Sequence, residues 1–262
     1  MGNIIAVSAN KGGSLKTSIS TNLAGVISKN GKKVCLIDLD NQGNVAITFG
    51  KNPDDLEYTI YDVLVDDIDP FAAIINVSDN LDIIAANDDM AYLEIDVLTK
   101  VKKYPKPLNL LSKSIEKLKE KYDYIIIDTP PQMGMIAANV FNCAEDIIIP
   151  YHPEVYSFRS MVKSMKAIKQ FQKDNENLKI KAVVPVKVKK TLTHEAFLDS
   201  GKALCEQNDV YFSNTVISES IKYTEAVGRY RKPITLATES SKVIDQYSEI
   251  YNKLTKELDY IG

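Results

Sequence analysis

The sequence has no tryptophan, two histidines and only three cysteines among its 262 residues. The cysteines are too few and too widely spaced for a disulfide framework or a paired-cysteine metal site, and Cys35 and Cys143 are expected as small core residues. No apolar run approaches the roughly 20 residues that cross a bilayer. No basic lead or cleavage site accompanies the apolar residues 4–7. We therefore expect a cytoplasmic protein without a signal peptide and without a membrane span.

The charges are distributed unevenly along the chain. The formal net charge is -3, yet residues 51–99 hold 13 Asp and Glu against the single Lys51. The remainder is therefore net basic. This asymmetry leaves two interpretations open: a basic face that binds a polyanion, or two solvated surfaces that have no partner.

Short apolar, β-branched runs alternate with longer helical patterns. Alternation of this kind predicts a single α/β domain over residues 1–262, with a doubly wound, mostly parallel sheet and helices on both faces. The expected strands are Ile4–Ser8, Lys33–Leu39, Leu81–Ala85, Tyr124–Asp128, Asp146–Pro150, Ile180–Val186 and Val210–Val216. The expected helices span residues 16–29, 108–121, 154–173, 193–208 and 239–258.

The first expected strand is followed by a glycine-containing loop, Lys11–Ser18, that leads into a helix. A phosphate site needs exposed backbone N–H groups, a helix N-terminus, a fixed cation and a hydroxyl for Mg²⁺, and the loop offers all of these. It still departs twice from the pattern GxxxxGK[ST], because Asn10 and Leu15 stand at its two glycine positions. Taken alone, the loop is a weak signal.

Carboxylates follow two further strands. Asp38 and Asp40 come at the end of the second expected strand, and Asp128 ends the apolar run that begins at Tyr124. Ligands of doubly wound sheets bind at the carboxyl ends of the strands, where these acids could hold Mg²⁺ or a water. An Asp in such a position is also a common helix cap, so each acid alone decides little.

Taken together, these segments resemble the ParA/Soj branch of the deviant Walker ATPases, P-loop NTPases that are relatives of MinD and of the nitrogenase iron protein. The resemblance rests on Lys11–Ser18, Asp38–Asn44 and Asp128–Pro131, and it continues in order through Lys232-Pro233-Ile234. It therefore spans nearly the whole chain. The segment that contacts the base in the family differs here, at Ile217–Ser220, so no adenine contact is assigned.

The resemblance implies roles for single residues, with ATP and Mg²⁺ as cofactors. Lys11 corresponds to the signature lysine that reaches the phosphates of a partner subunit, Lys16 to the lysine that binds the β- and γ-phosphates, and Asp40 to the residue that positions the attacking water. These three are the expected catalytic residues. Thr17, Asp38 and Asp128 are the expected magnesium ligands or orient its water shell. The expected nucleotide-binding residues are Lys11, Gly12, Gly13, Ser14, Leu15, Lys16, Thr17 and Ser18.

The resemblance also implies a DNA-partitioning ATPase that forms an ATP-dependent homodimer and binds DNA non-specifically. It implies slow hydrolysis that a ParB-like centromere-binding protein stimulates, association with the nucleoid, and no binding to membranes. The expected DNA-binding residues are Lys187, Lys189, Lys190, Lys222, Arg229 and Arg231.

Two alternatives stay open. A MinD-like membrane switch needs a C-terminal amphipathic helix with a basic polar face. The last expected helix has an acidic polar face instead, and its apolar stripe is expected to dock on the domain; the stripe contains Val243, Tyr247, Ile250, Leu254 and Leu258. The other alternative is a nucleotide-bound adaptor in which Leu15 impairs hydrolysis.

Overall fold

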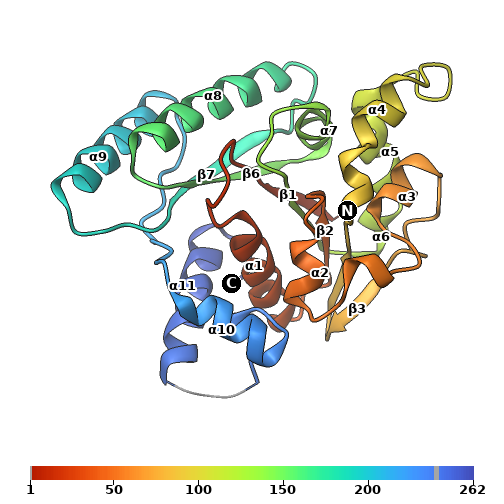
Figure 1. The fold of residues 1–262 in the computed structure, drawn as a ribbon. Coiled ribbons are helices and arrows are strands. Elements are labelled where there is room, and N and C mark those ends of the chain that lie inside the picture. Colours follow the sequence, from red (N-terminus) through yellow and green to blue (C-terminus); the bar gives the residue numbers. More distant parts are fainter. Residues whose placement is uncertain (1, 239–241) are drawn as a thin grey trace.

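The computed structural model describes residues 2–238 and 242–262, which build an α/β fold around a seven-stranded sheet (Figure 1). The strands lie in the order β3-β4-β2-β5-β1-β6-β7. Neighbouring strands are parallel except at one edge, where β3 pairs antiparallel with β4. The expected doubly wound, mostly parallel sheet is confirmed. The strands are β1 (Asn3–Val7), β2 (Val34–Asp38), β3 (Ile75–Ser78), β4 (Leu81–Ile84), β5 (Tyr124–Asp128), β6 (Asp146–Tyr151) and β7 (Lys179–Pro185).

The sheet is apolar on both faces because successive side chains of a strand point to opposite sides. In β1, Ile4 and Ala6 belong to one buried cluster, whereas Ile5 and Val7 belong to the other. All four side chains have no exposed surface. Two separate cores therefore sandwich the sheet, as a parallel sheet covered by helices on both faces requires.

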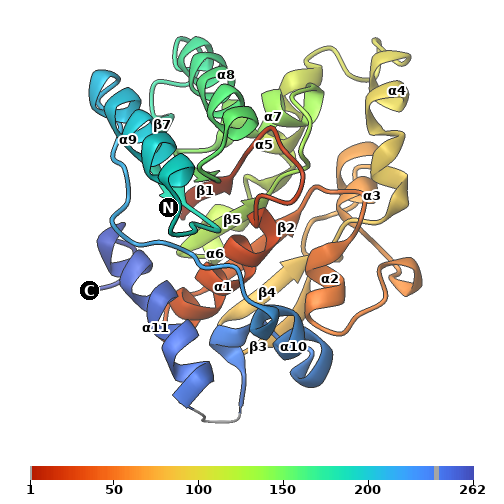
Figure 2. The same cartoon turned by 60° about the vertical axis from the view of Figure 1, so that its left-hand side comes forward.

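Helices cover both faces (Figures 1 and 2). One core includes side chains of α1 (Lys16–Lys29), α2 (Asn44–Thr48), α10 (Ile221–Tyr230), the 3₁₀ turn Ile234–Leu236 and α11 (Lys242–Glu257). The opposite core includes side chains of α3 (Ile60–Val65), α4 (Leu93–Leu98), α5 (Leu110–Ile115), α6 (Leu118–Lys121), α7 (Met135–Cys143), α8 (Val155–Phe171) and α9 (Leu192–Gln207). Further 3₁₀ turns are Pro53–Asp55, Asp88–Ala91 and Pro107–Asn109.

Several sequence-based expectations were wrong or incomplete, and helices α2, α3, α4, α7 and α10 were not among those expected. Val210–Val216 is not a strand, since it makes only one isolated bridge, between Phe212 and Val183 of β7; the following Ile217 bridges Val186, just beyond β7. The expected helix over residues 108–121 is divided into α5 and α6. The edge strand β3 was not expected, and it is short and irregular in register. Of the expected helix 239–258, residues 239–241 lie outside the described residues.

The apolar stripe of the last helix is buried. Tyr251 and Leu254 have no exposed surface, and Leu258, just beyond α11, is 1% exposed. All three pack in the same core as α1, while the side chain of Val243 lies outside the described part. The expectation of a docked helix is therefore confirmed for the described residues. Within residues 2–238 and 242–262, no helix is long and apolar enough to span a membrane.

Candidate nucleotide site

The loop after β1 and two buried carboxylates meet at the carboxyl edge of the sheet. In the register of the parallel strands, Asp128 stands beside Val7 of β1 on one side and beside Asp38 of β2 on the other. Both carboxylates have no exposed surface. The three strand ends thus bring Asp38, Asp128 and the loop that begins after Val7 to one place.

The glycines of the loop are exposed and face open space. Gly13 has φ = +70°, and a Cβ atom added to Gly12 or Gly13 would meet nothing within 4 Å. The Ser14 hydroxyl donates to the carbonyl of Lys11 at 3.0 Å, and the Lys16 ammonium donates to the same carbonyl at 3.2 Å. The loop is therefore held from inside and leaves room above its glycines, as the binding of a phosphate group requires.

The α1 helix begins at Lys16, directly below this loop. No acidic residue stands in its first turn, so the partial positive charge of the helix N-terminus is not neutralised there. Lys16 is 7% exposed; burial lowers its pKa, which the nearby carboxylates of Asp128 and Asp40 counteract. A buried cation at a helix N-terminus suits a polyanionic ligand.

Hydroxyl groups of α1 hold the Asp128 carboxylate. Thr17 Oγ1 donates to one oxygen at 2.6 Å, and Ser20 Oγ donates to the other at 3.0 Å. Burial raises the pKa of Asp128 to about 6, although both hydroxyls and Lys16 act in the opposite direction. The predicted magnesium residues Thr17 and Asp128 are therefore in direct contact.

The Asp38 carboxylate is fixed by backbone amides. It accepts hydrogen bonds from the N–H groups of Asp40 and Val45, each at 3.0 Å. Burial, and then the nearby charge of Asp128, raise the pKa of Asp38 well above its usual range. Asp40 is only partly buried and accepts a hydrogen bond from the Gln42 N–H at 3.1 Å.

These donors suit a hydrated divalent cation. Asp38 and Asp128 are adjacent and buried, and their pKa values are raised, so a nearby cation would stabilise their charged forms. The Thr17 hydroxyl offers a neutral oxygen ligand. Within the described residues, no group of three or more His, Cys, Asp or Glu could hold a metal by itself. A magnesium ion here would need further oxygens, which the phosphates of a nucleotide and water can supply.

Lys11 is directed away from the loop that it begins. Its ammonium is ion-paired with the carboxylate of Glu154 and lies 3.3 Å from Ser157 Oγ, in the first turn of α8. Burial and the charge of Lys187 lower the pKa of Lys11. Glu154 and Ser157 had no predicted role, since 143 residues separate Glu154 from Lys11 in the sequence.

Leu15 occupies a backbone conformation that normally belongs to glycine. Its φ and ψ are 62° and 22°, in the left-handed region, and it is the N-cap residue of α1. For a residue with a Cβ atom, this conformation costs roughly 1–2 kcal/mol. The partly buried side chain packs against the core that contains α1. Glycine adopts this conformation without that cost, which explains why the phosphate-loop pattern has glycine at this position. In this chain, Leu15 adopts it with strain.

Leu15 also lines a pocket of about 420 Å³ that extends from Thr17 and Ser18 to α10. Lys187 and Glu219 meet at this pocket, where their ammonium and carboxylate are 3.0 Å apart. Apart from Leu15, its apolar lining residues are Ile47, Tyr223, Val227 and Pro233. The pocket is continuous with the phosphate loop and is large enough for the nucleoside part of a nucleotide. The sequence pattern had identified none of these apolar residues.

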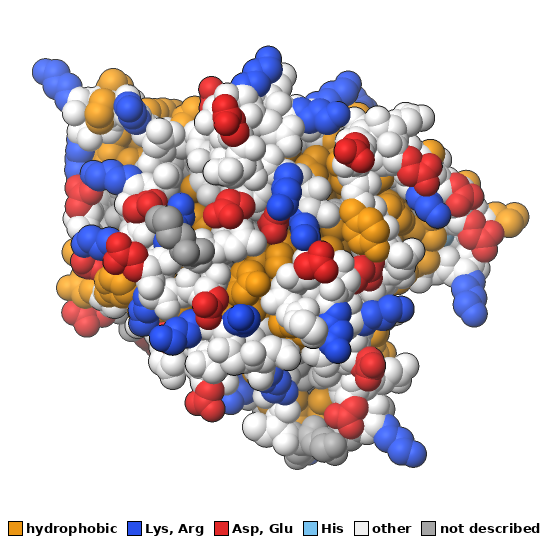
Figure 3. Space-filling model, turned by 180° about the vertical axis from the view of Figure 1, so that it is seen from behind, with side chains coloured by type: hydrophobic (Ala, Val, Ile, Leu, Met, Phe, Trp, Pro, Cys, Tyr) orange, Lys and Arg blue, Asp and Glu red, His pale blue; other side chains and the backbone are white. Residues whose placement is uncertain are grey.

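The predicted DNA-binding residues occupy two segments. Lys187, Lys189 and Lys190 follow β7, whereas Lys222 and Arg229 lie in α10 and Arg231 ends it. Some already have partners: Lys222 pairs with Glu225 at 2.6 Å, and the Arg229 guanidinium lies 5.3 Å from the Tyr230 ring centroid. Lysines and arginines are interspersed with acids over the face shown in Figure 3. A polyanion site can therefore be assigned to particular elements, but it cannot be recognised from the net charge of this surface.

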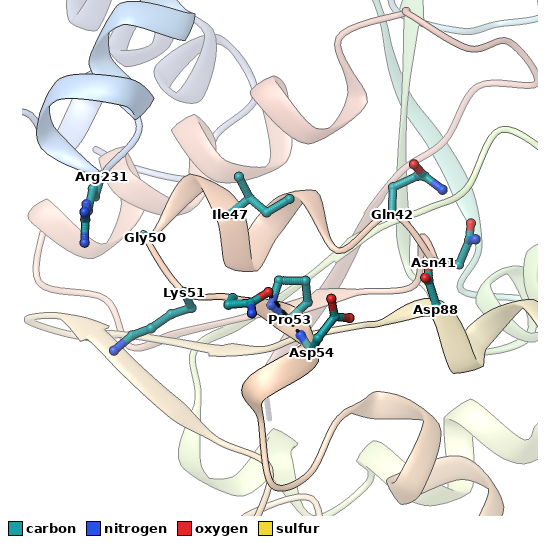
Figure 4. Close-up of a pocket in the computed structure, with 10 residues that line it drawn as sticks. Asn41, Gln42, Ile47, Gly50, Lys51, Pro53, Asp54, Asp88 and Arg231 are labelled. Carbon is teal, nitrogen blue, oxygen red and sulfur yellow. Dashed lines mark hydrogen bonds between the residues drawn. The ribbon is translucent and has the colours of Figure 1, made fainter.

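Arg231 belongs to a second hollow, of about 500 Å³, between the end of α10 and the segment after α2 (Figure 4). Its backbone is left-handed, with φ = 50°, and its carbon chain lies close over Gly50, where an added Cβ would come within 2.6 Å of it. Lys51 lines the same hollow. Figure 4 shows both cations at one end and Asp54 and Asp88 toward the other.

Comparisons with known proteins agree with this geometry. The family model described as "AAA domain" matches residues 2–180. The chain is 32% identical to the ParA family protein MG470 of Mycoplasma genitalium over 267 residues, covering 97% of this chain and 96% of that protein. It is also 32% identical to the sporulation initiation inhibitor protein Soj of Bacillus subtilis over 264 residues, covering 98% of each.

Two solved structures share the fold over nearly the whole chain. A putative plasmid partition protein from Borrelia burgdorferi, bound to AMPPNP, is 27% identical with a TM-score of 0.72, covering 98% of this chain and 99% of that one. Cobyrinic acid a,c-diamide synthase from Mycobacterium smegmatis, with a bound ATP analogue and magnesium, is 26% identical with a TM-score of 0.75. That match covers 98% of this chain and 95% of the synthase.

Proposed function

The chain belongs to the ParA family, and from this premise we propose that it is a partitioning ATPase that binds ATP with Mg²⁺, dimerises, and binds DNA without sequence preference. One observation carries the proposal. Lys16, Thr17, Asp38, Asp40 and Asp128 converge below an open glycine loop at a helix N-terminus. Related structures hold ATP analogues, in one case with magnesium.

In the proposed complex, the backbone of Gly12 and Gly13 and the ammonium of Lys16 bind the phosphates. Thr17 would ligate the magnesium ion and Asp38 and Asp128 would orient its water shell; the bound ion would neutralise charge on the phosphate oxygens. Asp40 is more exposed than Asp38 and orients the attacking water. Phosphoryl transfer is catalysed mainly by such positioning and by cations near the developing charge.

Lys11 makes the reaction depend on a second subunit. In the proposed dimer it leaves Glu154 and binds the phosphates of the partner, as the family resemblance implies. Exposed apolar side chains surround this edge of the sheet and fit a face that is covered on dimerisation; they include Ile47, Val155, Tyr156, Leu192 and Ile221. Burial of such side chains supplies much of the free energy of association.

The proposed DNA contacts are made by Lys189 and Lys190 after β7 and by the basic residues of α10, through backbone phosphates. Lys187 is instead paired with Glu219 at the candidate nucleotide pocket. A ParB-like centromere-binding protein is proposed as the partner that stimulates hydrolysis, with the nucleoid as the place of action. The relatives MG470 and Soj support the family on which this proposal rests.

The test is binding to random-sequence duplex DNA with ATP-Mg²⁺, with ADP and without nucleotide, each over a salt series. We expect salt-sensitive binding with ATP alone, and loss of binding in Lys16→Ala. Lys32→Ala, at an exposed lysine beyond α1, is the matched control that should behave as wild type. If no nucleotide state binds DNA while ATP still binds, the partition function is wrong.

The left-handed Leu15 favours a second candidate, an adaptor that binds ATP but does not turn it over. A single-turnover measurement of phosphate release from purified protein distinguishes the two. Release of about one phosphate per bound ATP supports the ATPase. Retention of intact ATP, with release restored in Leu15→Gly, supports the adaptor.

A further inference from the structure

His152 and Lys11 contact the same carboxylate, that of Glu154. The Lys11 ammonium is ion-paired with Oε1, and His152 Nδ1 lies 3.5 Å from Oε2. His152 directly follows β6 and Glu154 caps the start of α8, in a turn where the Glu154 N–H donates to the His152 carbonyl at 2.8 Å. The carboxylate therefore has two basic neighbours: a lysine that is charged at neutral pH, and a histidine that is charged only below its pKa.

Several segments of the chain bring charged groups to His152. Its side chain is 22% exposed, and its ring packs edge to face on the ring of His194 in α9, with the ring centroids 5.4 Å apart. Figures 1 and 2 both show α9 beside α8. His194 Nδ1 in turn accepts a hydrogen bond from the Lys189 N–H at 3.1 Å. The titratable and charged groups that face His152 are Lys11, Glu154, His194, Lys187 and Glu219.

These surroundings favour the neutral form of His152. Burial lowers its pKa, and the ammonium of Lys11 is the next largest cause, ahead of the charges of His194 and Lys187. The Glu219 carboxylate acts in the opposite direction. Because the ordinary pKa of histidine is about 6.5 and here it is lowered, the ring is mainly neutral at pH 7 while Lys11 contacts Glu154.

Departure of Lys11 would reverse this balance. His152 would lose the neighbouring ammonium that disfavours its charged form, and Glu154 would lose its cation. A partly buried carboxylate next to an imidazole stabilises the protonated ring. We propose that His152 takes up a proton from solvent when Lys11 leaves Glu154 for the partner subunit, so that the histidine replaces the lysine as the cation beside Glu154. This inference rests on the proposed ATP-dependent dimer and makes its formation sensitive to pH.

The direction of the pH effect follows from proton linkage. The pKa of His152 is higher in the dimer than in the monomer, so each subunit of the dimer binds an additional proton between the two values. Dimerisation is then strongest below the pKa of the monomer and weakens as the pH rises through the pKa of the dimer. His152 is thus a positioning residue, which acts on Lys11 through the carboxylate that both contact.

The first measurement needs no dimer. The chain has two histidines, so an NMR titration of the full chain without nucleotide follows both rings, and His194→Gln assigns their signals. Lys11→Ala imitates the departure of the lysine and should raise the pKa of His152 by about 0.5 or more. Lys32→Ala, at an exposed lysine beyond α1, is the matched control that should leave this pKa unchanged. An unchanged or lower pKa in Lys11→Ala overturns the proposal, whatever the protein does.

The second measurement is the dimer dissociation constant at about pH 6.5 and about pH 8, by analytical ultracentrifugation with a saturating non-hydrolysable ATP analogue and Mg²⁺. Wild type is compared with His152→Gln, because the phosphates and the other carboxylates titrate in both proteins. Relative to this variant, the wild-type dimer should be about threefold to tenfold tighter at the lower pH than at the higher. His194→Gln should keep this dependence, since it retains His152.

The outcomes separate this inference from the proposed function. A dimer whose pH dependence is the same in wild type and His152→Gln overturns the inference alone. So does a wild-type dimer that, relative to the variant, strengthens as the pH rises. Absence of a dimer at both pH values overturns the proposed function, and the inference with it.

Discussion

The ammonium of Lys11 is ion-paired with the carboxylate of Glu154 in the same chain, so Lys11, the proposed signature lysine, is already engaged before the proposed dimer forms. The pair is about one-third exposed at each end. Interactions of this kind contribute at most about 1 kcal/mol, a factor of about five in an equilibrium. The contact is therefore strong enough to bias the proposed dimerisation and too weak to prevent it.

Glu154→Gln should strengthen ATP-dependent dimerisation, because Lys11 no longer has to leave a carboxylate. We expect the dimer dissociation constant with a non-hydrolysable ATP analogue to fall by up to about fivefold, measured by analytical ultracentrifugation. Lys11→Ala should weaken the dimer, and Glu206→Gln, at an exposed glutamate of α9, should leave it unchanged. A weaker dimer in Glu154→Gln would mean that Glu154 assists Lys11 in the assembled state.

The left-handed conformation of Leu15 predicts an unusual order of stabilities. Leu15→Ala and Leu15→Gly both remove the packing of the side chain, but only glycine relieves the conformational cost. The glycine variant should therefore be the more stable of the two by about 1 kcal/mol, the reverse of the usual order. Urea unfolding without nucleotide measures the difference. An alanine variant as stable as the glycine variant would contradict the assigned backbone conformation.

The raised pKa of Asp128 predicts a stability that falls as pH rises. Its pKa is about 6 in the folded protein and about 4 in the unfolded chain, so the folded state binds the extra proton between these values. Stability is then highest below about pH 4 and is lost progressively up to about pH 6, by up to about 3 kcal/mol.

Comparison with Asp128→Asn reports this effect together with the part of the Asp38 shift that the charge of Asp128 causes. Asparagine does not titrate, so the wild type should gain stability relative to the variant as pH falls from 7 to 5. Chemical unfolding without nucleotide or metal at both pH values measures the gain. A difference between the two proteins that does not depend on pH would show that Asp128 titrates in its usual range.

Substitution of Lys190 and of Lys187 should affect different binding steps, DNA binding for the first and ATP binding for the second. Lys190 is exposed, and we expect Lys190→Ala to lower the salt slope of DNA binding by about 0.9 for one lost phosphate contact. Lys187 is paired with Glu219 and lines the nucleotide pocket, so Lys187→Ala should change ATP affinity and leave the slope intact. Filter binding over a salt series measures the slope and isothermal titration the affinity. The opposite pattern would place Lys187 on the DNA.

The sequence was sufficient to predict the positions of residues that lie at the ends of strands. Asp38 and Asp128 end apolar runs, and parallel strands present their carboxyl ends at one edge, so their placement at that edge follows from the pattern. That β2 lies directly beside β5, which makes the two carboxylates neighbours, does not. The helix after Lys16 followed from the glycine loop in the same way.

Other features depended on tertiary contacts. Glu154 could not be paired with Lys11 from the sequence, because the pair closes only when α8 packs beside the loop. The left-handed φ of Leu15 contradicts the local preference of leucine, so it emerges only from the folded loop. Val210–Val216 has strand-like residues, yet Ser213 Oγ accepts from the Thr215 N–H and bends the segment.

That bent segment has a further consequence for assembly. The backbone of residues 211–217 forms hydrogen bonds with Val183, Pro185 and Lys187, so this segment occupies the outer side of β7. At the other margin the sheet ends in β3, four residues long and irregular in register. Continuation of the sheet from one molecule into the next is thereby discouraged on both sides. In the proposed dimer, the subunits would therefore join through side chains rather than through shared strands.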